Sequence, residues 1–326
     1  MIKYYKNIAQ NFLTILPYVG EFNLLNFYSS MKGHPLRDKE KHKRLKKRMI
    51  KHIEEGLIAD AKVCYHLKFD REVPRLGNIQ KHFRSLFRVY YDYNKILKRR
   101  IDKDFKTNSE RDYPKYFNRN FHFQTDGYTS EYSASLYDHQ VEILFAGMAG
   151  PMRRLILEEI KDYSNGEILE MACGTGSTTE IVSRFLPNAK ITATDLSYEY
   201  IEYAKVNRIL DNVIYQQLDA LSLTKHYDCI YNVFLLHELP MKERGKVLEK
   251  QLEQLSPGGK GIVIESLQLG DLDFLDEVLY DFPKYYHEPF YKNYIEHPVE
   301  DMLKSLGAKN IKITKRLFSK CISFSK

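Results

Sequence analysis

The hydrophobic positions in the second half of the chain alternate between short apolar runs and longer segments with helical spacing. The apolar runs predict strands at residues 167–171, 190–194, 213–217, 229–234 and 261–265. Helices are predicted between them, at 178–185, 198–207 and 241–255. Strands that alternate with helices favour a parallel sheet with helices on both faces. A terminal antiparallel hairpin is predicted from two further strand candidates, 308–314 and 318–324.

The first hundred residues have a helical pattern instead. Residues 38–55 form a charge-rich segment in which apolar residues recur at helical spacing, so we expect a helix with a solvated basic face. A second long helix is predicted over residues 79–101, where aromatic and aliphatic side chains form a stripe. Pro74 and Gly77 interrupt the pattern between the two helices. An N-terminal, mainly helical domain is therefore predicted before the α/β domain.

The charges divide the chain at a similar place. Residues 1–120 hold 28 Lys+Arg and 13 Asp+Glu, a balance of +15, whereas residues 121–326 hold 22 and 30, a balance of −8. This asymmetry marks a boundary near residue 120. We divide the chain into a basic helical domain (1–120), a lid or linker segment predicted to contribute to the active site (121–154), and an α/β domain (155–326).

Composition narrows the setting of the protein. No apolar run is long enough for a transmembrane helix, and the first residues lack the features of a signal peptide. The four cysteines are scattered without a CxxC pair, so neither a disulfide framework nor a zinc site is expected. These features favour a cytoplasmic protein.

The clearest candidate for ligand binding is the segment 170–176, where Glu170 ends the first strand and two glycines, Gly174 and Gly176, precede the next helix. Ligands of such sheets bind at the carboxyl ends of strands, where glycines allow close approach and a helix N-terminus is positive. A dinucleotide site would have glycine in place of Thr179, and Glu170 would repel a pyrophosphate. A ligand with a positive amino group, such as S-adenosylmethionine, fits better.

Two more acids follow the next two predicted strands. Asp195 lies nineteen residues after Gly176, where a carboxylate can accept hydrogen bonds from both ribose hydroxyls. Asp219 follows the third strand, where it can accept from the adenine amine while the Ala220 N–H reaches a ring nitrogen. Each acid taken alone is typical of a helix N-cap. Three acids after consecutive strands favour a nucleoside site.

These segments resemble class I S-adenosylmethionine-dependent methyltransferases, and in particular the ubiquinone/menaquinone-biosynthesis-like subgroup that acts on small molecules. The resemblance covers residues 155–265 and is carried by segments 168–176, 191–197, 218–220, 227–240 and 255–259. It implies a Rossmann-like, seven-stranded, mostly parallel sheet and S-adenosylmethionine as cofactor. Ala172 departs from the family pattern, which usually has its first glycine there. The implied cofactor-binding residues are Glu170, Ala172, Gly174, Gly176, Asp195, Leu196, Asp219, Ala220, Asn232 and Tyr137.

The acceptor is expected over the same edge of the sheet, beneath the segment that precedes the first strand and the insertion at residues 281–291. Both are rich in aromatic residues, which suits a pocket wall. Packing of one domain on the other is an equally good explanation of the tyrosines. The expected substrate-pocket residues are Tyr128, Tyr132, Phe234, Tyr286 and Tyr291.

Two histidines are candidates for a general base. His237 follows the fourth strand and His287 lies in the aromatic insertion. Alternatively, His237 caps a helix or bonds within the domain. No metal is expected, because these histidines and the glutamates beside them lack the helical i, i+4 spacing of a ligand pair. Methyl transfer also proceeds without a base when the acceptor carries no proton.

The acceptor class remains open between two alternatives. A small hydrophobic or aromatic metabolite is favoured by the aromatic segments. The alternative is an RNA or tRNA methyltransferase whose basic N-terminal domain binds nucleic acid. It is less favoured, because Asn232 is followed by Val-Phe-Leu instead of the Pro-Pro-Phe/Tyr of amino methyltransferases, and no Pro-Cys nucleophile occurs. The N-terminal helices are also candidates for a homodimer interface.

Overall fold

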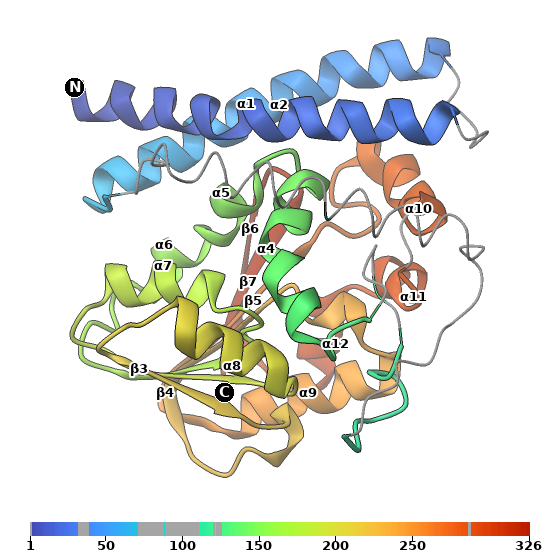
Figure 1. Ribbon diagram of the computed structural model, residues 1–326. Coiled ribbons are helices and arrows are strands. Elements are labelled where there is room, and N and C mark those ends of the chain that lie inside the picture. Colours follow the sequence, from blue (N-terminus) through green and yellow to red (C-terminus); the bar gives the residue numbers. More distant parts are fainter. Residues whose placement is uncertain are drawn as a thin grey trace.

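The computed structural model describes residues 2–31, 39–70, 88, 111–119, 121, 126–285 and 288–326. Its centre is a seven-stranded sheet of order β3-β2-β1-β4-β5-β7-β6 (Figure 1). The first five strands are parallel, and β7 runs antiparallel to both β5 and β6. The predicted Rossmann-like, mostly parallel sheet with a terminal hairpin is therefore confirmed. The strands are β1 (Glu167–Met171), β2 (Lys190–Asp195), β3 (Val213–Gln217), β4 (Tyr227–Val233), β5 (Leu255–Ser266), β6 (Lys309–Arg316) and β7 (Ser319–Ser325).

Helices cover both faces of the sheet because successive strand residues point to opposite sides. Leu169, Ile230 and Val263 face one core, where they pack against α9 (Met241–Glu253), α10 (Asp276–Tyr285), α11 (Tyr291–Glu296) and α12 (Val299–Ser305). Ile168 and Ile262, each one residue away, face the opposite core with α6 (Ile156–Ile160) and α7 (Ser177–Phe185). The near-continuous apolar character of the strands follows from this double burial.

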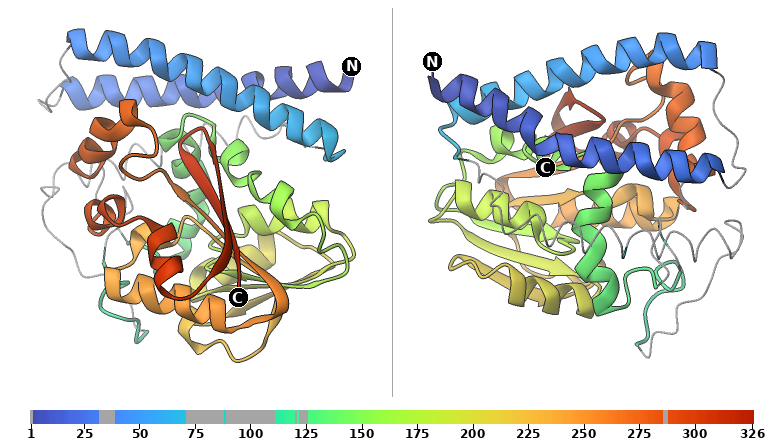
Figure 2. Two further views of the ribbon diagram at one scale, coloured as in Figure 1. Left: turned by 180° about the vertical axis from the view of Figure 1, so that it is seen from behind. Right: turned by 45° about the horizontal axis from the view of Figure 1, so that its top comes forward.

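The N-terminal helices α1 (Ile2–Met31) and α2 (Lys39–His66) lie side by side on top of the α/β domain (Figures 1 and 2). The predicted helix over residues 38–55 is part of α2, and the predicted helix over 79–101 falls outside the described residues. Gly56 brings α2 close to the turn between β6 and β7, since a Cβ there would lie 2.5 Å from Leu317 Cδ2. His52 Nε2 lies 2.6 Å from the Leu317 carbonyl oxygen at the same contact.

A buried ion cluster fastens the two N-terminal helices to the rest of the molecule. Asp60 of α2 accepts from Arg154 Nη2 (2.7 Å), which follows α5 (Ala149–Arg153), and from Asn11 Nδ2 of α1 (3.0 Å). Arg316 at the end of β6 lies 3.6 Å from the same carboxylate. All four side chains are buried. The division of the chain at residues 120 and 154 stays a prediction, because most of residues 71–110 lie outside the described ranges.

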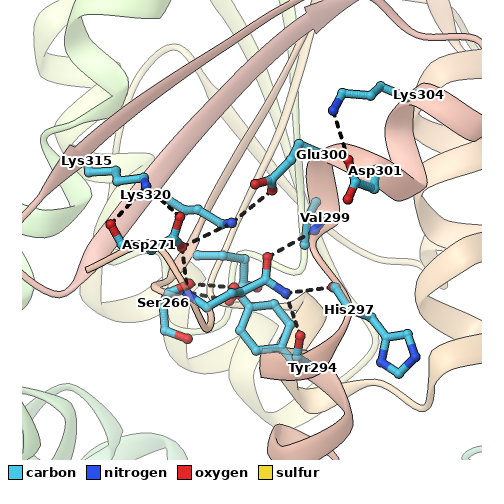
Figure 3. A network of polar contacts seen from close by, with 12 residues as sticks. Ser266, Asp271, Tyr294, His297, Val299, Glu300, Asp301, Lys304, Lys315 and Lys320 are labelled. Atoms are coloured by element: carbon cyan, nitrogen blue, oxygen red, sulfur yellow. Dashed lines mark hydrogen bonds and ion pairs between the residues drawn. The ribbon is translucent and has the colours of Figure 1, made fainter. Parts of the chain in front are cut away.

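Polar contacts also hold the segment between β5 and α12 against the sheet (Figure 3). Lys320 of β7 is fully buried and pairs with Asp271 (3.1 Å) and Glu300 (2.8 Å). Gln268 donates to the Tyr294 and His297 carbonyl oxygens (2.5 and 2.7 Å) and accepts from the Val299 N–H (2.9 Å). This segment is therefore a fixed wall beside the carboxyl end of β5. Within the described residues, no helix is both long and apolar enough to cross a bilayer.

Candidate cofactor site

A pocket opens at the carboxyl ends of β1, β2, β3 and β4, and five aromatic residues that precede β1 also line it: Tyr116, Phe117, Phe121, Tyr128 and Tyr137. The three predicted strand-end acids, Glu170, Asp195 and Asp219, all line it. They come together because the carboxyl ends of neighbouring parallel strands share one edge of the sheet. The other predicted cofactor residues that line the pocket are Ala172, Gly174, Leu196, Ala220 and Tyr137.

Glu170 is buried at the end of β1 between two hydroxyl groups. Thr179 Oγ1 and Tyr231 Oη both donate to its Oε2, at 2.5 and 2.8 Å. Burial raises the pKa of Glu170 to about 7, although these two hydrogen bonds act in the opposite direction. A positive group in the pocket would draw off the proton, so this carboxyl suits an ammonium ligand.

Asp195 is oriented by the backbone at the end of β2. The Gly174 N–H donates to Oδ2 and the Ser197 N–H donates to Oδ1, both at 2.8 Å. Loss of hydration raises the pKa of Asp195 to about 6, and the backbone hydrogen bonds limit the rise. Because its partners are backbone groups, the carboxylate has a fixed direction. It remains a hydrogen-bond acceptor at neutral pH.

Asp219 both caps a short helix and lines the pocket. Its Oδ1 accepts from the Leu221 N–H (2.9 Å), so it caps the short 3-10 helix η1 (Ala220–Ser222). The same side chain lines the pocket together with Ala220. The cap therefore fixes the direction of a carboxylate that a ligand can reach.

The glycine loop between β1 and α7 takes a left-handed backbone conformation at several residues. Gly176 has a φ of 81°, and a Cβ there would lie 2.8 Å from Tyr215 Oη, so a larger residue is excluded twice over. Ala172 has a φ of 57°. It therefore adopts the conformation that favours glycine, and it stands where the resembling family usually has one. Gly176 caps α7 and is not among the residues that line the pocket.

The helix α4 (Glu131–Leu144) is clamped to this loop by a residue that the sequence did not single out. Asp138 Oδ1 accepts from Thr175 Oγ1 (2.6 Å) and Ser177 Oγ (2.7 Å), and Oδ2 pairs with Arg208 (2.7 Å). Arg208 also donates to the Thr175 carbonyl oxygen (2.7 Å). The clamp keeps Tyr137, one residue earlier, in the pocket wall. No spacing rule marks Asp138, because its partners come from two separate segments, residues 175–177 and Arg208.

Aromatic rings form the cover of the pocket. Tyr128 is buried, its ring centroid lies 5.1 Å from that of Phe121, and its hydroxyl donates to Glu238 Oε1 (2.5 Å). Phe234 also lines the pocket, as predicted. Tyr132 does not line it, and its ring lies beneath the Arg88 guanidinium instead, 4.6 Å away.

Two further predicted residues lie away from the pocket. Asn232 is buried inside β4, where its Nδ2 donates to Gln251 Oε1 (2.9 Å) across to α9. Tyr291 is buried in the core beneath α9 to α12, with its ring centroid 4.8 Å from that of Phe282. Tyr286 and His287 lie outside the described residues, so their roles stay predictions.

His237 is not where a base for this pocket is needed. It lies in the 3-10 helix η2 (Leu236–Glu238), where its Nδ1 is 2.7 Å from Glu265 Oε2 and its ring faces Tyr291 and Tyr294. Burial lowers its pKa, but the charge and hydrogen bond of Glu265 outweigh this and raise the pKa to about 9. A protonated imidazole has no lone pair to accept a proton. In the structure His237 bonds within the domain, to Glu265, which is the alternative considered above. The neighbouring residue, Glu238, lines the pocket.

One basic residue in the pocket was missed by the sequence analysis. Arg153 at the end of α5 is buried and lines the pocket, with its Nη1 3.9 Å from a carboxylate oxygen of Glu142. Among the described residues it is the only cation in the pocket lining. In the sequence it is one of 50 Lys+Arg, and nothing in the local pattern separates it from the others. The described residues contain no group of three His, Cys, Asp or Glu side chains placed to hold a metal ion.

The same part of the chain matches a known family model. Residues 168–259 match the model described as "Methyltransferase domain". This segment is therefore similar to a methyltransferase domain. The match begins in β1 and ends in β5, so it contains the glycine loop and all three strand-end acids.

Individual relatives of the methyltransferase domain are distant. The chain is 29% identical over 141 residues to the ubiquinone/menaquinone biosynthesis C-methyltransferase UbiE of Pseudomonas fluorescens (strain Pf0-1), covering 40% of this chain and 54% of that protein. The chain thus spans about half the length of this curated relative.

Two solved structures are similar at lower identity. One is human N-acetylserotonin methyltransferase in complex with SAM, with 18% identity, a TM-score of 0.44, and coverage of 63% of this chain and 73% of that one. The other is an O-methyltransferase family protein from Burkholderia thailandensis, with 14% identity, a TM-score of 0.47, and coverage of 77% and 71%.

The residues that line the pocket fit S-adenosylmethionine. The ligand has a positive amino group, a carboxylate, a ribose and an adenine. The pocket offers Glu170 for a cation, Arg153 for an anion, and two oriented acids, Asp195 and Asp219, for hydrogen-bond donors. The charges on the pocket wall are therefore complementary to those of the cofactor.

Proposed function

We propose that this protein is an S-adenosylmethionine-dependent methyltransferase that acts on a small hydrophobic or aromatic metabolite. The observation that carries this proposal is the meeting of three strand-end acids and a glycine loop in one covered pocket. The matched methyltransferase domain supports the reaction class. The aromatic cover of the pocket supports the acceptor class.

Each polar group of the pocket has a distinct part in holding the cofactor. Asp195 would accept from the ribose hydroxyls, and Asp219 with the Ala220 N–H would bind the adenine. Glu170 would bind the amino group and Arg153 the carboxylate, because both are buried and of opposite charge to those groups. The whole cofactor is thereby oriented by side chains that are themselves held by hydrogen bonds.

When bound, S-adenosylmethionine supplies a methyl group that is already activated for displacement by its sulfonium centre. The protein then has to align the acceptor and exclude water. Tyr128, Phe121 and Phe234 provide an apolar boundary at the covered side of the pocket. The clamp through Asp138 holds α4 in the closed position that this boundary requires.

We propose that Glu238, and not His237, makes the polar contact with the acceptor. Glu238 lines the pocket beyond the strand-end acids, and Tyr128 donates to it. A carboxylate held in this way can accept a hydrogen bond from a hydroxyl or amino group of the acceptor and so direct its lone pair. His237 supports Glu238 from behind through its position in η2 and its ion pair with Glu265.

The small-molecule reading is preferred to the RNA alternative. The curated relative is named for ubiquinone/menaquinone biosynthesis, and nothing in the comparisons supports an RNA methyltransferase. The aromatic cover also suits a flat apolar acceptor. A homodimer through the N-terminal helices remains a prediction.

The test is transfer of a labelled methyl group from S-adenosylmethionine to a pooled library of small aromatic and hydrophobic metabolites. We expect labelled products with the wild-type protein and none with Gly174→Arg, because an arginine side chain would fill the pocket beside Tyr137. The matched control is Gly307→Arg, which also has a positive φ but nothing within 4 Å of the added Cβ. Equal labelling by wild type and Gly174→Arg would refute the proposed reaction.

A further inference from the structure

The helix α1 has an apolar side that no described part of the molecule covers. Within its 30 residues only Lys3, Lys6 and Glu21 are charged. Its buried positions recur on one side, at Asn7, Asn11 and Ile15. The other side exposes a row with helical spacing, which we call the apolar row: Tyr5, Ala9, Leu13 and Leu16.

The exposure in this row is high for such large side chains. Leu13 is 65% exposed, and Tyr5 and Leu16 are each 61% exposed. Single exposed apolar residues are common on protein surfaces, but a regular row along one helix marks an interaction surface.

The helix beside it has a basic side. Residues 39–51 contain eight Lys+Arg and one Glu. Within the described side chains, we call the exposed positions Lys47, Lys51, Ile58 and Lys62 along one side of α2 the basic row, and the exposed Glu54 and Glu55 lie beside it. Lys51 has a loose ion pair with Glu55 (3.8 Å) in which both side chains are largely exposed, so the row keeps a positive balance.

The two rows both face away from the α/β domain. Asn11 of α1 and Asp60 of α2 bond each other and Arg154 at the junction with α5. The apolar and basic rows lie on the sides of α1 and α2 opposite to this junction. Figure 2 shows the two helices as an outer layer of the molecule. One broad partner can therefore contact both rows.

We propose that this outer side of α1 and α2 binds the surface of a bilayer that contains anionic lipids. Such a surface matches both rows, since the leucines enter the acyl boundary while the lysines meet lipid phosphates. The charge asymmetry agrees, because the −8 balance of residues 121–326 keeps the α/β domain away from an anionic surface.

Two other occupants fit less well. RNA would match the basic row but would leave the exposed leucines unexplained. A second copy of the chain would bury the leucines but would bring two basic rows toward each other. We propose that α1 lies in the plane of the bilayer surface, because this helix is not apolar enough to cross a membrane.

The experiment is co-sedimentation of the full-length protein with vesicles, without cofactor. We expect binding to phosphatidylcholine vesicles that contain phosphatidylglycerol, weaker binding to pure phosphatidylcholine, and loss of binding at high salt. Leu13→Ser/Leu16→Ser and Lys47→Glu/Lys51→Glu should each reduce the partition coefficient by at least about tenfold. Because the changed side chains are exposed, folding should be unaffected, and circular dichroism checks this.

Matched controls come from the α/β domain. Ile209→Ser changes an apolar residue that is 83% exposed, and Lys242→Glu reverses an exposed charge, and both should bind vesicles as wild type does. The proposal is overturned if neutral vesicles bind as well as anionic ones, or if the controls lose as much affinity as the row variants. It is also overturned if the protein does not bind vesicles and the leucine change abolishes a dimer. The same holds if the protein does not bind vesicles and the lysine change abolishes a complex with tRNA. Because methyl transfer plays no part in this assay, the proposed reaction stands or fails separately.

Discussion

Glu170 and Asp195 show how the surroundings of a side chain set its chemistry in this pocket. Glu170 is held by two hydroxyl groups, whereas Asp195 is held by two backbone N–H groups. Loss of hydration raises both pKa values, to about 7 for Glu170 and to about 6 for Asp195. At neutral pH Asp195 is therefore mostly ionised, while Glu170 is protonated in much of the ligand-free protein.

The raised pKa of Glu170 predicts a pH-dependent stability of the ligand-free protein. The pKa of about 7 in the folded state lies above the ordinary glutamate value of 4.5, so the folded state holds a proton that the unfolded state releases between these values. The associated stability is fully present below about pH 4.5 and is lost as the pH rises through 7, a change of about 3 kcal/mol at most. Urea unfolding of Glu170→Gln, which cannot titrate, should lack this component. An identical pH dependence in wild type and variant would contradict the assignment.

Single residues also show what sequence reasoning reaches. The three acids were found because they follow consecutive strands, and parallel strands end at one edge. His237 was misplaced because neighbouring residues of a short turn point in different directions, and Glu238 is the one that faces the pocket. Asp138 was missed because its partner Arg208 is distant in sequence, and Arg153 was missed because nothing in the local pattern separates it from the other basic residues. The functional roles of all these residues remain predictions.

The helix α4 holds the cover of the pocket in place, since Asp138 joins it to the glycine loop. The carboxylate accepts hydrogen bonds from the hydroxyl groups of Thr175 and Ser177 and pairs with Arg208, and folding is what brings these two segments to α4. α4 also lies between α1 and α8 (Tyr198–Asn207). The cover of the pocket is therefore held both by the N-terminal helices and by the loop that it covers.

Asp138→Asn is expected to loosen α4 without unfolding the sheet. Loss of the charge weakens the contact with Arg208, so amide hydrogen exchange over residues 131–144 should quicken and cofactor affinity should fall by about tenfold. The control is Asp301→Asn, which removes an exposed ion pair with Lys304 in α12 and should change neither quantity. If amide hydrogen exchange is unchanged in the Asp138 variant, Asp138 does not hold α4 in place.

Most strand boundaries followed the sequence to within two residues; β4, predicted at 229–234, spans Tyr227–Val233. Strands β1 and β3 have the predicted bounds, and β2 continues one residue further, to Asp195. β5 begins at Leu255, six residues before the predicted start, because Pro257 and Gly258 read as a turn. In the structure Leu255 pairs with Tyr227 of β4, and the register shifts before pairing resumes at Cys229 and Lys260. Pairing with a neighbouring strand thus overrode the local signal.

For the whole molecule, the buried cluster around Asp60 decides whether the N-terminal helices and the α/β domain act as one body. Arg154 follows α5 and Arg316 ends β6, and both are buried beside this carboxylate. Arg316 also pairs with Glu158, so removal of Asp60 leaves mainly the buried charge of Arg154 without its ion-pair partner. The charge asymmetry of the sequence predicted two parts of the chain, but it did not predict the buried ion cluster that joins them.

Asp60→Ala should therefore destabilise the protein by about 3–5 kcal/mol, the range for breaking a buried ion pair. Denaturant unfolding measures this, and the midpoint should fall markedly. Glu55→Ala, in the same helix but in an exposed pair with Lys51, is the control and should change stability by less than about 1 kcal/mol. A loss of similar size in both variants would show that the cluster does not join the two parts.

The central claim is that the covered pocket binds S-adenosylmethionine, and calorimetric titration with S-adenosylhomocysteine tests it most directly. We expect saturable one-to-one binding by the wild-type protein. Asp195→Asn should weaken it by at least about tenfold, since the ribose would lose a charged acceptor. Asp211→Asn, an exposed acid of the same domain, should bind as wild type does. Absence of binding by the wild type, or equal affinity in the Asp195 variant, would contradict the account.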